Sequence, residues 1–141
     1  MGDNVAEVTA RTYAICYAIP PGRVTTYGHI AKLAGYPNYS RHVGNALKSL
    51  PAGTPVPWFR VISSKGIISP RGDGGRGVAR QRERLEADGV EVETVSALGE
   101  RVDMRRYGWF PERGEQTLDA WIEAHIGPAA VGGVEGDAAG D

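Results

Sequence analysis

Cysteine and histidine are scarce in this sequence. Its 141 residues include one cysteine, Cys16, and three histidines, His29, His42 and His125. A single sulfur cannot form an internal disulfide, and a thiolate zinc site needs several sulfur ligands or closely spaced histidines, which are absent here. We therefore expect no disulfide, no bound metal and no other cofactor.

Long hydrophobic runs are missing as well. No stretch approaches the roughly 18 to 20 apolar residues that span a bilayer, and the first residues lack the basic and apolar pattern of a signal peptide. We therefore expect an intracellular protein with no membrane partner. With 41% hydrophobic residues, the chain can build one modest core but is too short for two ordinary domains, so we expect a monomer with one globular domain.

The net charge of −1 is small but unevenly distributed. Residues 1–110 hold 15 of the 16 basic and 10 of the 17 acidic residues, whereas residues 111–141 carry one basic and seven acidic residues. Between Arg11 and Glu86 there are twelve basic and three acidic residues. This excess of positive charge is typical of a surface that binds a polyanion, although a solvated surface would give the same count.

The spacing of apolar residues predicts three helices in the first 50 residues. Between residues 5 and 19 one stripe recurs at intervals of three and four, and its members are Val5, Val8, Thr12, Ile15, Cys16 and Ile19. Thr25 or Thr26 can cap a second helix that ends at Gly35. A third helix is expected from about Ser40 to Leu50, and Thr26 and Ser40 are both plausible N-caps. The last two helices, joined by a short turn, form a helix-turn-helix outline.

The remaining sequence predicts smaller elements and a separate C-terminal segment. The prolines in residues 51–57 indicate a stiff loop, followed by a short strand or extended segment at 59–62 and a turn at 63–66. Residues 70–77 form a glycine-rich basic loop without the ending of a nucleotide-binding P-loop. We expect a charged helix at 78–88 capped by Gly89, an edge strand near 90–95, an amphipathic helix at 112–126 and disorder over 127–141. Residues 1–110 would thus form the domain and 111–141 an acidic extension.

Three ordered motifs carry a resemblance to a known family. They are Val-Thr-Thr-Tyr-Gly-His-Ile-Ala at 24–31, Ser-Arg-His-Val-Gly-Asn-Ala-Leu at 40–47 and Val-Pro-Trp-Phe-Arg-Val-Ile at 56–62. In order and spacing they resemble the DNA-binding domain of the O6-alkylguanine-DNA alkyltransferases, over roughly residues 5–110. The resemblance implies a mostly α-helical fold with a small β element, of the winged helix-turn-helix-like type.

One departure from this family decides the expected chemistry. Members that transfer alkyl groups carry a Pro-Cys-His-Arg-Val motif, whereas this sequence reads Pro-Trp-Phe-Arg-Val at 57–61. Alkyl transfer needs a thiolate and a base that generates it, and neither Trp58 nor Phe59 supplies one. The sequence therefore resembles the alkyltransferase-like proteins, which bind the lesion without repairing it. We expect no enzymatic activity.

The resemblance also assigns roles in DNA binding. Arg41 matches the arginine finger that fills the gap left by a flipped nucleotide, and Tyr27 matches a tyrosine that crowds the 3′ phosphate. The small residues around Gly44 would let the recognition helix approach the minor groove. The expected DNA-binding residues are Thr26, Tyr27, Ser40, Arg41, Gly44, Asn45 and Ala46. Arg41 could instead be an ordinary surface arginine. Likewise, Tyr27 could be a core aromatic residue, and Gly44 could be a contact between packed helices.

The expected lesion pocket consists of Tyr27, Trp58, Val61 and Arg71. Trp58 would form the wall on which a flipped base stacks, and Arg71 resembles an arginine that contacts the flipped guanine by a cation–π interaction. Alternatively, Trp58 could be a core residue, and Arg71 could belong to a basic loop that contacts phosphate. By position, Arg60 braces the loop, and Asp88 replaces a glutamate of the family's hydrogen-bond relay.

Two other functions stay open at this point. The first is a helix-turn-helix regulator that reads an intact DNA sequence, through Asn45 or His42 for example. The second is an alkyltransferase that uses Cys16, although its place on the apolar stripe indicates a core residue. By resemblance alone, the partners are double-stranded DNA containing O6-alkylguanine and nucleotide excision repair factors, which would place the protein in the nucleus of a eukaryotic cell and otherwise in the cytoplasm or nucleoid.

Overall fold

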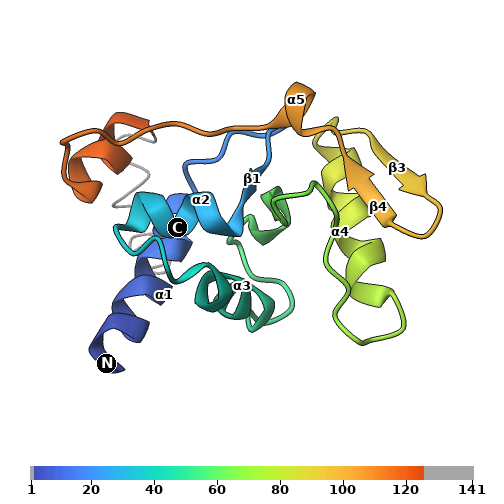
Figure 1. Ribbon diagram of the computed structural model, residues 1–141, viewed down its shortest axis with the longest axis horizontal. Helices are drawn as coiled ribbons and strands as arrows, with labels where there is room; N and C mark the ends of the chain where they lie inside the picture. The colour runs from blue at the N-terminus through green and yellow to red at the C-terminus, as the bar shows by residue number, and fades with distance from the viewer. Residues whose placement is uncertain (1, 126–141) are drawn as a thin grey trace.

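The computed structural model describes residues 2–125 and is mostly helical, which confirms the expected fold class (Figure 1). In chain order, its elements are α1 (Gly2–Cys16), β1 (Thr25–Thr26), α2 (Tyr27–Ala34), α3 (Ser40–Lys48), the 3-10 helix η1 (Trp58–Arg60), β2 (Val61–Ile62), α4 (Arg76–Ala87), β3 (Val92–Val95), β4 (Gly99–Val102) and α5 (Met104–Tyr107). A last helix runs from residue 118 to at least 125. None of the helices in this range is long and apolar enough to cross a membrane.

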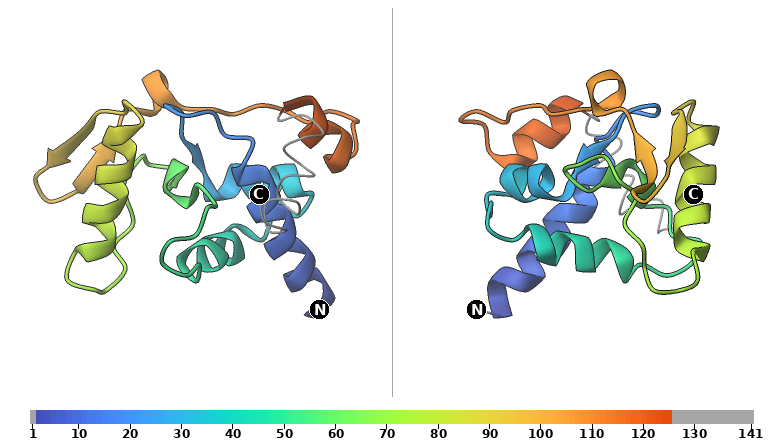
Figure 2. Two further views of the ribbon diagram at one scale, coloured as in Figure 1. Left: turned by 180° about the vertical axis from the view of Figure 1, so that it is seen from behind. Right: turned by 45° about the vertical axis from the view of Figure 1, so that its right-hand side comes forward.

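Helices α1, α2 and α3 pack around the main hydrophobic core. Most of the stripe predicted on the first helix faces this core, because Val8, Ile15, Cys16 and Ile19 are at most 1% exposed. The prediction was wrong for Val5, which is 42% exposed. The first turns of α1 project beyond the neighbouring helices (Figures 1 and 2), which leaves the side chain of Val5 partly exposed.

The predicted helix-turn-helix is formed by α2 and α3. Thr26 is the N-cap of α2, and its hydroxyl accepts a hydrogen bond of 3.1 Å from the backbone N–H of His29. Gly35 ends α2 at a φ of 90°, a left-handed conformation that favours glycine. Ser40 was a candidate N-cap of α3, but it does not cap the helix. It lies in the first turn, and Tyr39 precedes the helix without a side-chain cap.

Two small sheets complete the domain, and only part of them was predicted. β1 pairs in parallel with β2, so that Thr25 faces Val61 across the register. β3 and β4 form an antiparallel hairpin in which Val92 faces Val102. The sequence did not predict β4, because no alternating pattern marks it. The hairpin lies against α4 (Figure 2), where Leu85, Val92 and other side chains form a second core.

The C-terminal helix starts later than predicted and belongs to the main core. It begins at residue 118, not 112, because Thr117 caps it by accepting a hydrogen bond from the N–H of Ala120. Trp121 is fully buried, and it packs with Leu118 and Ile122 in the same cluster as α1. This part of the acidic extension is therefore packed onto the domain. The disorder predicted for 127–141 lies outside the described residues.

Candidate nucleic-acid interface

The exposed face of α3 presents a polar stripe. Arg41, Asn45 and Lys48 are exposed and spaced by four and three positions, so they lie on one side of the helix. Arg41 forms no hydrogen bond or ion pair with any residue between 2 and 125, and its guanidinium is available to a ligand. Ser40, also exposed, stands beside it at the start of the helix. Ser40, Arg41 and Asn45 are the members of the predicted DNA-binding set that are exposed, whereas Lys48 was not predicted.

Gly44 and Ala46, in contrast, face inward. A Cβ atom built on Gly44 would lie 3.7 Å from Cδ1 of Tyr27, so this glycine is a packing contact between α3 and α2. Ala46 is 7% exposed, and its carbonyl accepts a hydrogen bond from the Tyr13 hydroxyl. Neither side chain faces an open surface. A Cβ atom at Gly44 would make only an ordinary van der Waals contact with Tyr27, and the side-chain hydrogen bond that Ala46 accepts comes from Tyr13 of α1.

The two predicted contacts at the start of α2 differ in accessibility. Tyr27 is half-buried, with its ring against Gly44 and the Lys48 ammonium 6.0 Å from its centroid. Thr26 is 7% exposed, and its hydroxyl oxygen already caps α2. Tyr27 can thus reach a ligand bound beside α3, whereas Thr26 is mainly a structural cap.

His42, a candidate for reading bases in the regulator hypothesis, points to α1. Its Nε2 atom lies 2.8 Å from the Thr9 hydroxyl and 3.1 Å from the carbonyl of Val5. Of the two side chains named for sequence reading, only Asn45 is exposed and uncommitted. Base reading by His42 would require breaking its contacts with α1.

A basic cavity of about 310 Å³ adjoins the C-terminal end of α3. Four cationic side chains line it together with Trp58, and no carboxylate does; the lining residues are Leu47, Lys48, Leu50, Pro51, Ala52, Gly53, Thr54, Trp58, Arg71, Arg80 and Arg84. The proline loop at 51–57 forms one wall, and α4 contributes two of the arginines. Such a cavity favours an anionic or electron-rich ligand.

Trp58 and Arg71 meet at the wall of this cavity. The Arg71 guanidinium lies over the Trp58 ring at 4.7 Å from its centroid, in the geometry of a cation–π contact. Trp58 is half-buried and packs edge-to-face on Phe59, with ring centroids 5.9 Å apart. Two residues predicted from separate motifs are therefore side by side, and each retains a surface toward the cavity.

Gly77, which sequence reasoning missed, sets the position of Arg71. A Cβ atom on Gly77 would lie 2.5 Å from Cδ of Arg71 and 3.0 Å from Oδ2 of Asp73. The Asp73 carboxylate accepts a hydrogen bond from the Gly77 N–H at 2.9 Å, which folds the glycine-rich loop back onto the start of α4. The absence of a side chain at Gly77 gives the stem of Arg71 room to lie there. The sequence predicted Gly77 in the glycine-rich loop and the helix from residue 78, whereas α4 begins at Arg76, so no sequence signal marked this contact.

Gln81, also missed, fixes the segment that carries Trp58. Its side-chain amide donates hydrogen bonds of 3.0 Å to the carbonyls of Phe59 and Val61, and the residue is 1% exposed. On the other side, the Arg60 guanidinium makes two hydrogen bonds with Asp88, of 2.7 and 3.2 Å, and one of 3.1 Å with the carbonyl of Ile19. Arg60 thus braces the loop, as its position in the motif predicts. A polar residue on the buried side of a helix was the signal for Gln81.

The other two predicted pocket residues do not line this cavity. Val61 is 1% exposed and packs in the main core behind Trp58, so its side chain supports the wall from behind. Tyr27 lies beside Gly44 and Lys48, at the edge of the α3 surface. Of the predicted pocket residues, Trp58 and Arg71 line the cavity, together with the proline loop and the cations of α3 and α4.

Cys16 is unsuited to alkyl transfer. The residue is fully buried in the main core, and burial raises the pKa of its thiol to about 12, against a smaller opposite effect of Arg60. The thiol is therefore protonated at neutral pH and has no access to a ligand. This geometry contradicts the hypothesis of a transferase that uses Cys16.

Comparisons with known proteins agree on one family. Residues 7–90 match the model of the 6-O-methylguanine DNA methyltransferase DNA-binding domain. A DNA base-flipping protein of Vibrio parahaemolyticus is 50% identical over 105 residues, which are 74% of this chain and 98% of that protein. Alkyltransferase-like protein 1 of Schizosaccharomyces pombe is 46% identical over 106 residues, which are 74% of this chain and 96% of the relative.

A solved structure leads to the same conclusion. The Schizosaccharomyces pombe protein in complex with damaged DNA containing O6-carboxymethylguanine is similar to this chain with a TM-score of 0.71 and 42% identity. The match covers 75% of this chain and 97% of that structure. With its matching fold, motifs and relatives, the chain belongs to the family of the 6-O-methylguanine DNA methyltransferase DNA-binding domain, and within it to the alkyltransferase-like proteins.

Proposed function

We propose that this protein binds DNA damaged by O6-alkylation of guanine and holds the flipped base in the basic cavity beside Trp58. The contact of Arg71 with Trp58, at 4.7 Å, carries this proposal. An aromatic face and a guanidinium at the wall of a cavity that excludes carboxylates suit a purine taken out of the base stack. The relatives named as base-flipping proteins and the structure bound to damaged DNA support this function.

Arg41 and Tyr27 act on the DNA itself. Arg41 is exposed at the start of α3, without an intramolecular partner between residues 2 and 125, and it can enter the space that the flipped nucleotide leaves. Unstacking a base costs a few kcal/mol, so a group that fills the gap is needed to offset part of that cost. Tyr27 lies at the edge of the same surface, where it contacts the backbone near the flipped nucleotide. Ser40 and Lys48 bind adjacent phosphates.

The protein does not transfer the alkyl group. Trp58 occupies the position of the nucleophile in the family motif, and the only thiol of the sequence, Cys16, is buried and protonated. Binding without chemistry leaves the lesion in the DNA, so another activity has to remove it. By the resemblance to the alkyltransferase-like proteins, we propose that this activity is nucleotide excision repair, which would put the protein in the nucleus of a eukaryotic cell and otherwise in the cytoplasm or nucleoid.

Two variants test the pocket. Arg71→Ala and Trp58→Ala should each reduce the preference for a duplex with O6-methylguanine over an undamaged duplex, because stacking on an aromatic contributes about 1–3 kcal/mol per base. Lys32→Ala removes an exposed cation outside the cavity and serves as the matched control. A preference that survives both pocket substitutions would contradict the assignment.

The regulator hypothesis predicts a different pattern. A sequence-reading protein would bind one intact sequence, lose specificity when Asn45 is replaced, and ignore alkylation. Titration of Asn45→Ala with several undamaged duplexes distinguishes the two functions. We expect weak and uniform affinity for all of them, before and after the substitution.

A further inference from the structure

Three arginines form a row along one side of α4. Arg76, Arg80 and Arg84 are exposed and follow one another at intervals of four residues, so each lies about 6 Å beyond the last along the helix axis. Within residues 2–125 none of these three guanidiniums forms an ion pair. Glu83 lies on the flank of this arginine row that is further from Arg84, and it is not ion-paired within that range either.

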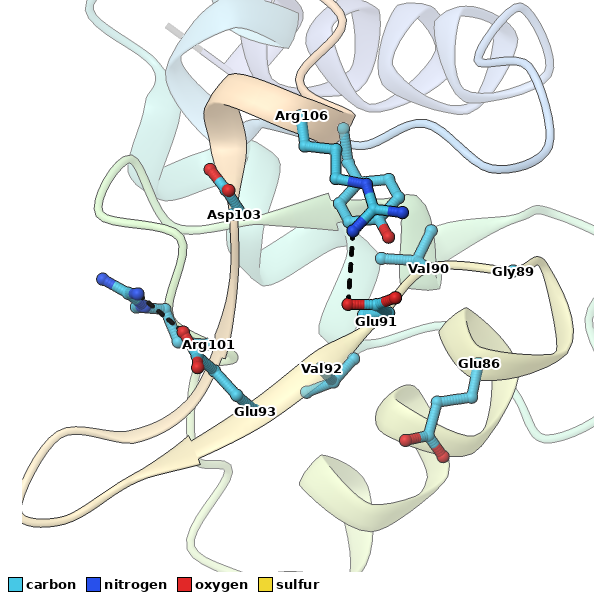
Figure 3. A pocket seen from close by; sticks show the side chains of 10 residues that line it. Glu86, Gly89, Val90, Glu91, Val92, Glu93, Arg101, Asp103 and Arg106 are labelled. Atoms are coloured by element: carbon cyan, nitrogen blue, oxygen red, sulfur yellow. Dashed lines mark hydrogen bonds and ion pairs between the residues drawn. The ribbon is translucent and has the colours of Figure 1, made fainter.

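Other arginines on and near α4 are paired with carboxylates. Arg82, on another side of the helix, forms ion pairs with two glutamates. Figure 3 shows two further pairs around a cavity beside α4, Arg101 with Glu93 at 2.6 Å and Arg106 with Glu91 at 3.3 Å. The chain thus supplies carboxylates to the arginines on this part of its surface but none to the arginine row.

The arginine row is unfavourable for the helix that carries it. Arg76 is the first residue of α4, where the partial positive charge of the helix N-terminus repels a cation, and the first turn holds no acidic residue. Like charges four residues apart repel each other as well, which affects both neighbouring pairs of the row. An anion bound along this side of α4 offsets both repulsions. The arrangement is therefore typical of a site whose counter-ion belongs to a ligand.

The arginine row continues the surface that α3 presents to DNA. The basic cavity is lined by Lys48 of α3 and by Arg80 and Arg84 of α4. Figures 1 and 2 show α3 and the start of α4 toward the same edge of the molecule, with α5 at the opposite edge. A strand that delivers a base into this cavity passes over its mouth. The phosphates on the two sides of the flipped nucleotide then lie beside α3 and beside α4.

From this continuity, we propose that α4 is a second DNA-binding element, in which Arg76 and Arg80 hold backbone phosphates of the damaged strand. The inference rests on the proposed function, because a base in the basic cavity is what places the strand between the two helices. Helices α3 and α4 then clamp the strand on either side of the lesion. Arg84 stays with the pocket, since its guanidinium lies over the Phe59 ring, 5.0 Å from the centroid.

The salt dependence of DNA binding tests the clamp. The double variant Arg76→Gln with Arg80→Gln removes two charges and introduces a residue that helices tolerate well. Its affinity for a duplex with O6-methylguanine is measured by fluorescence anisotropy over a series of salt concentrations. Each lost phosphate contact lowers the slope of log K against log salt by about 0.9, so we expect a slope smaller by about two. The control pair Lys65→Gln with Arg105→Gln removes the same charge from exposed positions outside the cavity and should keep the slope of the parent.

Uncharged phosphates then locate the contact. In a set of damaged duplexes, one phosphate at a time beside the lesion is replaced by a methylphosphonate. Where α4 holds the replaced phosphate, the parent should bind more weakly, and the double variant should lose nothing further. Lys48→Gln should show the same behaviour at a phosphate on the other side of the lesion.

Three results would overturn the inference. They are an unchanged salt slope in the double variant, additive losses at every replaced phosphate, and one phosphate shared by both helices. An unchanged slope is also what an arginine row that binds an acidic protein instead of DNA would give. Equal affinity of the parent for damaged and undamaged duplexes would instead refute the proposed function, whatever the variants do.

Discussion

Replacing Gly77 by alanine separates stability from lesion recognition. The new Cβ atom would lie 2.5 Å from Cδ of Arg71, so the arginine stem has to move and its guanidinium leaves the Trp58 ring. A cation–π contact contributes roughly 0.5–2 kcal/mol. We expect the affinity for an O6-methylguanine duplex to fall by about 1 kcal/mol, which is roughly fivefold.

Stability should not fall with affinity. Gly77 is the second residue of α4, with a φ outside the left-handed region, so alanine gains there only part of the roughly 1 kcal/mol that favours it over glycine in a helix interior. The tight approach to Asp73, at 3.0 Å, offsets part of this gain. Urea denaturation should therefore give a free energy of unfolding within about 1 kcal/mol of the parent.

A double-mutant cycle with Arg71→Ala isolates the mechanism. If Gly77 acts by leaving room for Arg71, then Gly77→Ala should have no further effect on lesion affinity once Arg71 is alanine. Fluorescence anisotropy with damaged and undamaged duplexes at one salt concentration measures all four proteins. Additive losses in the double variant, or full affinity in Gly77→Ala alone, would refute the reasoning.

Three further predictions concern the role of Arg41 in base flipping, the support of the Trp58 segment by Gln81 and the buried thiol of Cys16. Arg41→Ala should abolish base flipping, which is measured by the fluorescence of a 2-aminopurine placed beside the lesion. A fluorescence signal as large as that of the parent would contradict the assignment of Arg41 as the finger. Gln81→Leu leaves the carbonyls of Phe59 and Val61 without this donor and should lower the free energy of unfolding by about 2 kcal/mol, whereas unchanged urea denaturation would contradict that support. Cys16, whose pKa burial raises to about 12, should resist a thiol reagent at pH 8 until urea unfolds the protein. Because the folded pKa lies above the ordinary 9.0, its contribution to stability is complete below pH 9 and is lost as pH rises toward 12.

The sequence predicted the helical part of the fold well because its signals are local. The cap at Thr26, the left-handed Gly35 and the buried stripe of α1 follow from short-range spacing, and the structure has all three. Strand β4 was missed because its pairing with β3 depends on tertiary contacts and its sequence does not alternate. The start of the last helix was placed six residues early because the cap at Thr117 was overlooked.

For the site, the motifs located residues but not the directions of their side chains. Arg41, Asn45, Trp58 and Arg71 lie on the expected surfaces, since the family spacing fixes their elements. Gly44, Ala46 and Val61 turn inward, which the order of residues within a motif does not reveal. Gly77 and Gln81 act through contacts with residues 6 and 20 to 22 positions away, so only the folded chain identifies them.

The central claim is tested most directly by comparing two labelled duplexes of identical sequence, one of which contains a single O6-methylguanine. The affinities of the purified protein are measured at the same stated salt concentration, because phosphate contacts make binding strongly salt-dependent. We predict that the protein binds the damaged duplex more tightly by about tenfold or more, which corresponds to roughly 1.4 kcal/mol. Equal affinity for the two duplexes would contradict the assignment of the basic cavity to a flipped alkylated guanine.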